Sequence, residues 1–341
     1  MPFAHSWNFE SFPARDETLG ALIRQLSDPE SGPPADNLIT NEDSFPRVVG
    51  ELRERAPGGG VYLGVGPDQN FTYIAEGRPE RAFVLDYRRR NLLLHLLHKG
   101  MFMLSPDRVT YLSRLTARRP SELPDDATAE DLVEAFERAE FDRDRLKATV
   151  EEVVKLLRPL NVVAENEWAD LATIQARLAG PGMNARFLAL PTYPTFGALI
   201  QTTDRTGRPA HLLAREESYQ ALRQTQQEDR ILPLVGDFAS PTVLPRLARW
   251  LEGRGLSVSI FYISDVEFFL LRAGRFDDYV ANLGQLPWAD GALLIRSSTR
   301  EIDHPDRVEG DIGTTILRPV APFLEAARAG HIRSDDDLFN H

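Results

Sequence analysis

The fold is decided by Val61-Tyr-Leu-Gly-Val-Gly-Pro-Asp-Gln-Asn70 and by the next apolar run, Ala82-Phe-Val-Leu-Asp86. Glycines at 64 and 66 end the first apolar run, and an amphipathic stretch follows them. This profile is typical of a buried parallel strand that turns sharply into a helix. The second run ends on an acid. A glycine turn after one strand and a carboxylate at the tip of the next can together hold a nucleoside in α/β proteins.

The later part of the chain alternates short apolar runs with amphipathic segments. We expect strands at residues 231–235, 258–263 and 291–295, helices at 241–254 and 276–283, and a core element at 187–190. This alternation predicts a parallel sheet with right-handed crossovers. The predicted fold class is therefore α/β, with a Rossmann-like, mostly parallel sheet flanked by helices.

Charged helical segments dominate between the second and third strands. Residues 128–140, 142–157 and 165–178 have helical spacing of apolar positions and no strand signal between them. We interpret residues 116–182 as a helical insertion or lid after the second strand. The remaining divisions are an N-terminal arm packing on the core (1–45), the two halves of the core (46–115 and 183–330) and a tail (331–341) whose acidic run is expected to fray.

Composition excludes several classes of function. The net charge of −12 argues against a nucleic-acid backbone or an anionic membrane as the main partner, because both would repel the protein. The chain has no apolar run near the roughly 20 residues that span a bilayer, and its first residues lack the basic start of a signal peptide. We expect a cytoplasmic protein that acts on a small molecule. A homodimer is compatible with the sequence, which does not fix the oligomeric state.

The sequence predicts no metal site. The chain has no cysteine, which excludes disulfides, thiolate metal ligands and cysteine nucleophiles. His95 and His98 share one face of a predicted buried helix, at a spacing that can bind metal. Because no carboxylate is placed to complete such a site, we interpret both histidines as packing or capping residues.

Small and acidic residues follow four of the predicted strands, and ligands of open α/β sheets bind beyond the carboxyl ends of the strands. Glycine and aspartate are common in the turns that follow strands, so each residue alone carries little information. Because four strand ends in one sheet all carry such residues, together they predict a ligand site. The residues are Gly64 and Gly66, Asp86, Gly236 and Asp237, and the group Ser264, Asp265 and Glu267.

The order of Leu63-Gly-Val-Gly66, Phe83-Val-Leu-Asp86 and Leu234-Val-Gly-Asp237 resembles the class I (Rossmann-like) S-adenosylmethionine-dependent methyltransferases, as a divergent bacterial branch. The resemblance covers roughly residues 46–105 and 225–300. It implies S-adenosylmethionine as cofactor, S-adenosylhomocysteine as product, and methyl transfer to nitrogen or oxygen of a small acceptor. It further implies that Gly64 and Gly66 adjoin the methionine part, that Asp86 binds the ribose, and that Gly236-Asp237 lies at the adenine.

Departures from the family pattern keep other functions open. Val61 and Tyr62 stand where the family has an acid, and Gln69 replaces the third glycine. One alternative is other S-adenosylmethionine chemistry, such as aminocarboxypropyl transfer. Another is a non-catalytic nucleoside-binding or scaffold protein that keeps the fold. An NAD(P)-dependent oxidoreductase is a weaker alternative, because the dinucleotide fingerprint needs the third glycine and room for a pyrophosphate.

Two sets of polar residues are candidates for the chemistry. Asp265 and Glu267, just after the fourth strand, are the predicted general base or ligand of a substrate amine; the alternative is that they cap the following helix. Asp68, Gln69 and Asn70 are predicted to recognise the amino-acid end of the cofactor, or else to cap the first turn of their helix.

Five further residues are candidates for the substrate pocket. Tyr73 and Tyr193 would line the pocket and contact a sulfonium through cation–π interactions. Tyr262 would point out of its strand. The alternative for these aromatic residues is that they pack in the hydrophobic core. Asn41 and Glu42 precede a predicted helix at 46–55. Helix capping is the simpler interpretation of this pair, and the alternative is that their stretch lies over the strand tips and closes the pocket.

Overall fold

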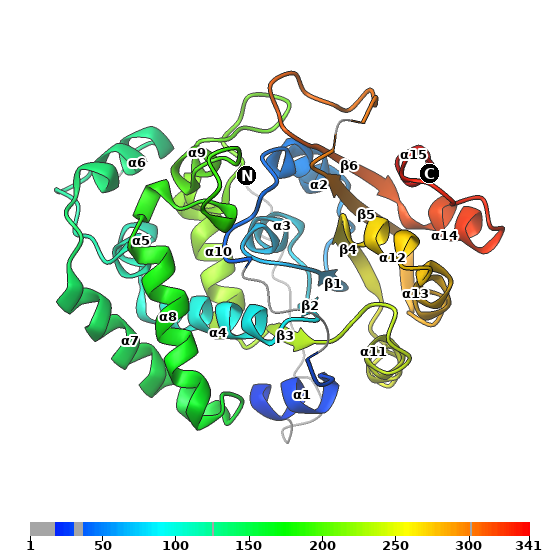
Figure 1. Ribbon diagram of the computed structural model, residues 1–341, viewed down its shortest axis with the longest axis horizontal. Coiled ribbons are helices and arrows are strands. Elements are labelled where there is room, and N and C mark those ends of the chain that lie inside the picture. Colours follow the sequence, from blue (N-terminus) through cyan, green and yellow to red (C-terminus); the bar gives the residue numbers. More distant parts are fainter. Residues whose placement is uncertain (1–17, 31–36, 125, 301) are drawn as a thin grey trace, which may run out of the picture.

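A computed structural model describes residues 18–30, 37–124, 126–300 and 302–341. Its centre is a six-stranded sheet in the order β3-β2-β1-β4-β5-β6 (Figure 1). The first five strands are parallel, and β6 runs antiparallel to β5. The strands are β1 (Val61–Gly64), β2 (Arg81–Asp86), β3 (Ile231–Val235), β4 (Val258–Ser264), β5 (Trp288–Ser298) and β6 (Thr314–Pro319). The predicted α/β fold class is confirmed.

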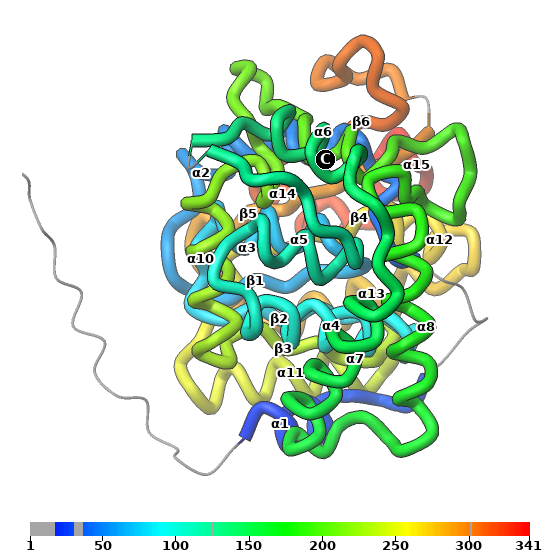
Figure 2. The backbone as a smooth tube through the Cα atoms, turned by 90° about the vertical axis from the view of Figure 1, so that its left-hand side faces the viewer, coloured from blue at the N-terminus to red at the C-terminus, as the bar shows by residue number. Residues whose placement is uncertain are grey.

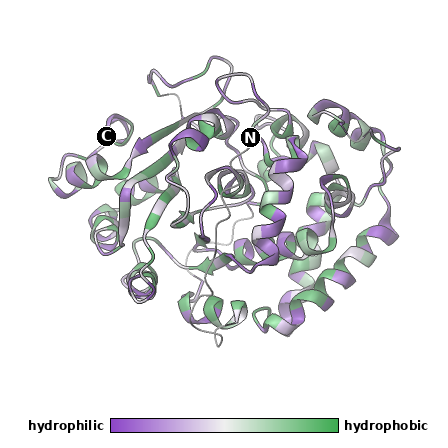
Figure 3. Cartoon of the chain, turned by 180° about the vertical axis from the view of Figure 1, so that it is seen from behind, coloured by the Kyte–Doolittle hydropathy of each residue, from purple (hydrophilic) through white to green (hydrophobic). Residues whose placement is uncertain are grey.

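Helices cover both faces of the sheet (Figure 1). On one side lie α2 (Val49–Arg55), α3 (Gln69–Gly77) and α10 (Glu216–Gln227), and on the other lie α11 (Val243–Glu252), α13 (Phe276–Leu283) and α14 (Val320–Arg328). Strands β1 and β3 are buried along their whole length, as expected of parallel strands covered on both faces. Figure 3 shows the same division, with apolar strands inside and hydrophilic helix faces outside.

The described chain between β2 and β3 contributes helices and no strand of the sheet. Figure 2 looks onto this side of the molecule, where α7 and α8 lie in front of the core. The segment contains α4 (Arg89–Leu104), α5 (Arg108–Thr116), α6 (Ala129–Arg138), α7 (Arg143–Leu157), α8 (Trp168–Ala179) and α9 (Phe196–Ile200). Its short 3-10 helices are η2 (Arg158–Leu160), η3 (Glu165–Glu167), η4 (Gly182–Asn184), η5 (Phe187–Ala189) and η6 (Leu212–Ala214).

The N-terminal helix α1 (Leu19–Leu26) packs beside the edge strand β3. Val235 donates its N–H to the Ser27 hydroxyl at 3.1 Å, and Asp28 donates its N–H to the Val235 carbonyl at 2.8 Å. Asp28 also forms an ion pair with Arg246 of α11. These contacts cover an edge that would otherwise expose unpaired backbone groups.

Three elements differ from the sequence predictions. Residues 187–190 are not core: they form the exposed turn η5, with Leu188 and Ala189 at positive φ. The acidic run at 335–337 does not fray: it opens helix α15 (Asp335–Asn340), where Ser334 and Asp337 form a capping box. Strand β6 has no counterpart among the predicted elements.

The loop before the core helices also differs in detail. Ser44 lies directly before the 3-10 helix η1 (Phe45–Val48), which continues into α2, and the Ser44 side chain makes no capping hydrogen bond. The Ser44 hydroxyl instead lies 2.8 Å from the hydroxyl of Thr315 in β6. Helix α12 (Val266–Arg272) follows β4 directly.

Candidate functional site

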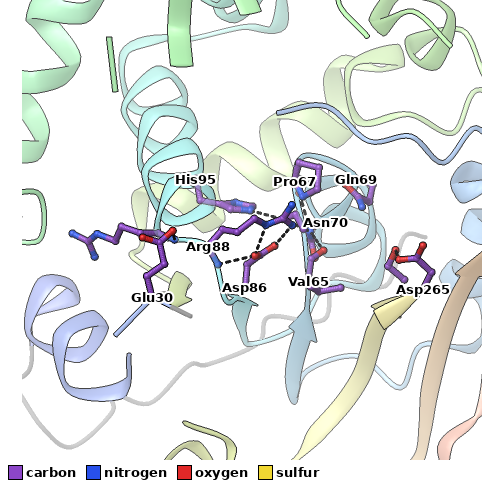
Figure 4. Close-up of polar contacts among 12 residues, drawn as sticks. Glu30, Val65, Pro67, Gln69, Asn70, Asp86, Arg88, His95 and Asp265 are labelled. Atoms are coloured by element: carbon purple, nitrogen blue, oxygen red, sulfur yellow. Dashed lines mark hydrogen bonds and ion pairs between the residues drawn. The ribbon is translucent and has the colours of Figure 1, made fainter. Parts of the chain in front are cut away.

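The side chain of Asn70 makes most of the hydrogen bonds that hold the glycine turn after β1 (Figure 4). The Asn70 amide nitrogen donates to the carbonyls of Val65 (2.8 Å), Gly66 (3.2 Å) and Pro67 (2.8 Å). Its amide oxygen accepts a hydrogen bond of 2.8 Å from the Tyr62 hydroxyl. Since Asn70 is fully buried and its hydrogen bonds go to the turn and to Tyr62 of β1, its role here is to fix the turn against the strand.

The two glycines serve this turn in different ways. A Cβ on Gly64 would lie 2.1 Å from the Asn70 amide oxygen, so no side chain fits there. Gly66 adopts a φ of 79°, which favours glycine. The Gly66 carbonyl also accepts from Nε2 of His95 in α4 at 2.8 Å, and burial lowers the His95 pKa to about 4, which keeps the ring neutral. Both glycines are therefore required by the turn itself.

Asp86, the predicted ribose ligand, is paired with Arg88 (Figure 4). Asp86 Oδ1 accepts from Arg88 Nε at 2.7 Å and from its backbone N–H at 3.0 Å, while Oδ2 accepts from Nη2 at 2.6 Å. Asp86 is only 1% exposed. A ligand can use both carboxylate oxygens only after the Arg88 side chain has moved.

Gly236 and Asp237, which follow β3, also contact other parts of the chain. A Cβ on Gly236 would lie 2.8 Å from Val243, so the glycine lets α11 approach the strand. Asp237 pairs with Arg275 and accepts the Ala239 N–H at 2.8 Å. The predicted adenine contact of Asp237 therefore stays a prediction, and its present partners stabilise the loop.

Glu42 reaches the carboxyl end of β4 from the loop before η1. Its Oε1 accepts hydrogen bonds from the Tyr262 hydroxyl (2.8 Å) and from the Ser264 hydroxyl. Tyr262 in turn accepts from Gln69 Nε2 at 2.7 Å, which links β4 to the first turn of α3. Glu42 is 2% exposed, and Oε2 has no hydrogen-bond partner among the described residues. We call Glu42, Gln69, Tyr262 and Ser264 the Glu42 cluster.

The Glu42 carboxyl titrates near neutral pH. Burial raises its pKa to about 7, the nearby Asp265 carboxylate adds to the rise, and the hydrogen bonds from Ser264 and Tyr262 oppose it. Burial also raises the Asp265 pKa. Neither acid forms a salt bridge within the described ranges. Ser264 has a φ of 55°, an uncommon value for a non-glycine residue and one often found at functional sites.

The two acids predicted after β4 separate in the structure. Asp265 lies at the start of α12, partly exposed, and makes no capping hydrogen bond through its side chain. Glu267 is fully buried, pairs with Arg296 of β5 through both oxygens, and accepts from the Tyr279 hydroxyl at 2.9 Å. Because Glu267 has no oxygen left for a substrate, we interpret it as a structural residue and omit it from the site.

The aromatic candidates other than Tyr262 make no hydrogen bond to the Glu42 cluster in the described ranges. Tyr73 is fully buried, its hydroxyl donates to the Phe45 carbonyl at 3.1 Å, and its ring centroid lies 5.0 Å from that of Tyr262. Tyr193 packs on Phe187 beside η5. Tyr73 is therefore a core residue, as the alternative interpretation had it. Tyr193 makes no hydrogen bond or ring contact with the Glu42 cluster in the part of the chain that the structure describes.

The loop of residues 37–44 lies over the end of the sheet where β4 ends and β6 begins, and its closing a substrate pocket stays a prediction. The Thr40 N–H donates to Asp68 at 2.9 Å near the start of α3, Glu42 reaches β4, and Asp43 accepts the N–H of Gly313 before β6 at 3.2 Å. Asn41 lies in the same loop, partly exposed. Asp68 therefore contacts this loop and does not cap its helix.

Sequence reasoning missed two participants. Arg88 was not among the predicted site residues, although its position two residues after Asp86 at a strand end is a usable signal for a local ion pair. Ser264 was recognised as a strand end but not as a partner of Glu42, and no local pattern connects residues 222 positions apart.

Neither a metal-binding cluster nor a membrane-spanning helix is found among the described residues. In the described ranges, no group of three or more histidine, aspartate or glutamate residues is arranged to hold a metal ion. Among the described helices, none is both long and apolar enough to cross a membrane.

Comparison with known proteins gives a family. A search of curated proteins found no match. One family model, described as "Domain of unknown function (DUF7790)", matches residues 38–327. The match begins in the loop that carries Glu42 and extends into α14, so it covers the sheet, the helical segment and the Glu42 cluster. The chain belongs to this DUF7790 family.

Proposed function

We propose that the protein binds S-adenosylmethionine and transfers its methyl group to nitrogen or oxygen of a small acceptor, with Glu42 as general base. The observation that carries the proposal is the position of the Glu42 cluster. The strand order reverses between β1 and β4, and ligands of doubly wound sheets bind at such a switch point. Gln69, from the turn after β1, and Tyr262, from β4, join across this point and hold Glu42 there.

The charges near the switch point favour a cationic ligand. The Asp265 carboxylate raises the Glu42 pKa, and Glu42 forms no salt bridge in the described ranges, whereas the positive charges of Arg300 and Arg88 partly offset the rise in the Asp265 pKa that burial causes. A nearby cation would stabilise both carboxylates and so lower their pKa values. S-adenosylmethionine brings a sulfonium cation, whereas a nicotinamide dinucleotide brings an anionic pyrophosphate that these acids would repel.

In this proposal, one set of residues binds the cofactor and Glu42 accepts the proton of the acceptor. The turn of Gly64 and Gly66 and the Asp86 carboxylate, once released by Arg88, would hold the cofactor, which supplies an already activated methyl group. Glu42 Oε2 is free to accept the proton of an acceptor N–H or O–H. Tyr262 and Ser264 fix Oε1, which orients the free oxygen. The value of kcat/KM should rise with pH and level off above about 7, because it reports the ionisation of Glu42 in the free protein and Glu42 must be ionised to accept a proton.

A non-catalytic nucleoside-binding protein is the second candidate, and two observations favour it. Arg88 occupies both oxygens of Asp86, and the Asn70 side chain fills the inside of the glycine turn. In this case the fold would bind a ligand without turnover, or act as a scaffold.

Calorimetry with S-adenosylmethionine and S-adenosylhomocysteine tests the proposal. We expect both to bind, and mass spectrometry of the spent cofactor with a panel of amines and alcohols should show S-adenosylhomocysteine. Methylthioadenosine would indicate aminocarboxypropyl transfer instead, and binding without turnover would indicate the non-catalytic candidate. No heat and no thermal shift at millimolar ligand would reject the cofactor altogether.

Arg88→Gln is expected to tighten S-adenosylhomocysteine binding by about tenfold, because the ligand would no longer have to displace the guanidinium from Asp86. Asp86→Asn should weaken binding by a similar factor. Arg89→Gln is the matched control, since Arg89 pairs with Glu167 instead. Equal affinities of the Arg88 variant and the unaltered protein, measured by calorimetry, would remove Asp86 from the site.

A further inference from the structure

Two adjacent hollows lie between the helical segment and the loop of residues 37–44. The outer groove has a volume of about 400 Å³ and is bordered by α8, η4 and η5. The inner hollow has a volume of about 10 Å³ and reaches Asp68 and His98. The two share the side chains of Leu38, Ile39, Leu178 and Ala185, which therefore form the partition between them.

Three polar side chains line the inner hollow: Thr116, whose hydroxyl donates to the Leu112 carbonyl, Asp68 and His98. His98 is 3% exposed; its Nδ1 shares a hydrogen bond of 2.7 Å with the Tyr111 hydroxyl, and its Nε2 has no partner among the described residues. Burial lowers the His98 pKa to about 3, so the ring is neutral and Nε2 can accept a hydrogen bond when Nδ1 carries the proton.

Asp68 presents a carboxyl to the same hollow. Its Oδ1 accepts the Thr40 N–H, and burial raises its pKa to about 6. No salt bridge offsets this acid in the described ranges. At neutral pH the hollow therefore holds a carboxylate and a neutral imidazole, both suited to accept hydrogen bonds, in an acidic protein.

The two hollows differ in size, so a ligand that fills both has a small polar head in the inner hollow and a larger body in the outer groove. The inner hollow has room for about one water-sized group, which an ammonium group matches. The outer groove is within the usual range of small-molecule sites, and much of its lining is apolar, including Leu178, Pro181 and Leu188. Its polar lining consists of Arg177, Asn184 and Arg186.

We propose that these hollows form a binding site for a primary amine with an apolar body. The ammonium head lies between Asp68 and His98, and the body lies in the outer groove after passing between Leu38, Ile39 and Leu178. This site does not include Glu42, and it stands independently of the proposed methyl transfer.

Binding of hexylamine to the full chain at pH 7.5, followed by calorimetry without cofactor, tests this inference. Hexanol and hexanoate are the comparison ligands. Asp68→Asn keeps the size of the side chain and removes its charge, and Asn184→Trp fills the outer groove from an exposed position with little risk to folding. Glu140→Gln is the matched control, because Glu140 is an exposed acid lining a separate hollow.

We expect hexylamine to bind at least tenfold more tightly than hexanol or hexanoate, and each of the two site variants to lose at least tenfold in affinity. The control variant should bind as the unaltered protein does. Absence of hexylamine binding, equal binding of hexanoate, or unchanged affinity in both folded site variants would overturn the inference. S-adenosylmethionine binding in separate titrations shows whether the proposed function stands or fails on its own.

Discussion

Glu42→Gln is expected to raise the free energy of unfolding at pH 8 by about 3 kcal/mol. The Glu42 pKa is about 7 in the folded protein against an ordinary value of 4.5. Between these values the folded state binds a proton that the unfolded state has lost, so stability falls as pH rises. Above pH 7 the folded protein carries the full cost of an ionised, buried carboxylate, which glutamine removes while it keeps an oxygen for Tyr262 and Ser264.

Urea denaturation at pH 8 and at pH 5 measures this effect. The stabilisation should shrink as pH falls from 7 towards 4.5, because both states then protonate the unaltered residue. Glu140→Gln, at an exposed acid, should change stability little at either pH. A Glu42 variant that is destabilised at pH 8, or whose effect does not depend on pH, would contradict the assignment. Where Glu42 serves as general base, the same stabilised variant should lose about 10²–10⁴-fold in turnover.

Glu267→Ala is expected to have the opposite effect, a loss of about 3–5 kcal/mol. It removes the carboxylate from Arg296, which is 1% exposed and would keep its charge in the core. Arg296 also donates to the Leu338 carbonyl, so the change should loosen α15.

Thermal and urea denaturation measure this loss. Combining Glu267→Leu with Arg296→Met should recover much of it, because the double change removes both buried charges. A loss of less than 1 kcal/mol in the single variant would show that the ion pair is not structural. A fully stable Glu267→Ala protein without turnover would restore Glu267 as a catalytic candidate.

Strand positions could be predicted because each parallel strand is a short apolar run. Residues 231–235 correspond fully to β3, and the run at 61–65 corresponds to β1 to within one residue. Strand β6 has only a short apolar core, Ile316 and Leu317, and depends on antiparallel pairing with β5. Helix α15 was missed because its acidic first turn is typical of a solvated tail, while its docking on Arg296 depends on contacts distant in sequence.

The strand-end residues could be placed because strands of one parallel sheet end at the same edge. Their partners could not, since Asp237 pairs with a residue 38 positions later and Glu42 with one 220 positions later. Asp265 and Glu267 lie two residues apart at the start of a helix, and residues at this spacing do not share a face. One therefore stays near the site while the other enters the core.

The most direct test of the central claim is the ¹³C NMR titration of the Glu42 carboxyl, assigned by its absence in Glu42→Gln, with and without S-adenosylmethionine. We expect a midpoint near pH 7 in the free protein. Saturating cofactor should move the midpoint lower, because a sulfonium close to the carboxyl favours its ionised form. A midpoint near 4.5 in the free protein, or one near 7 that the cofactor leaves unchanged, would contradict a cofactor site beside Glu42.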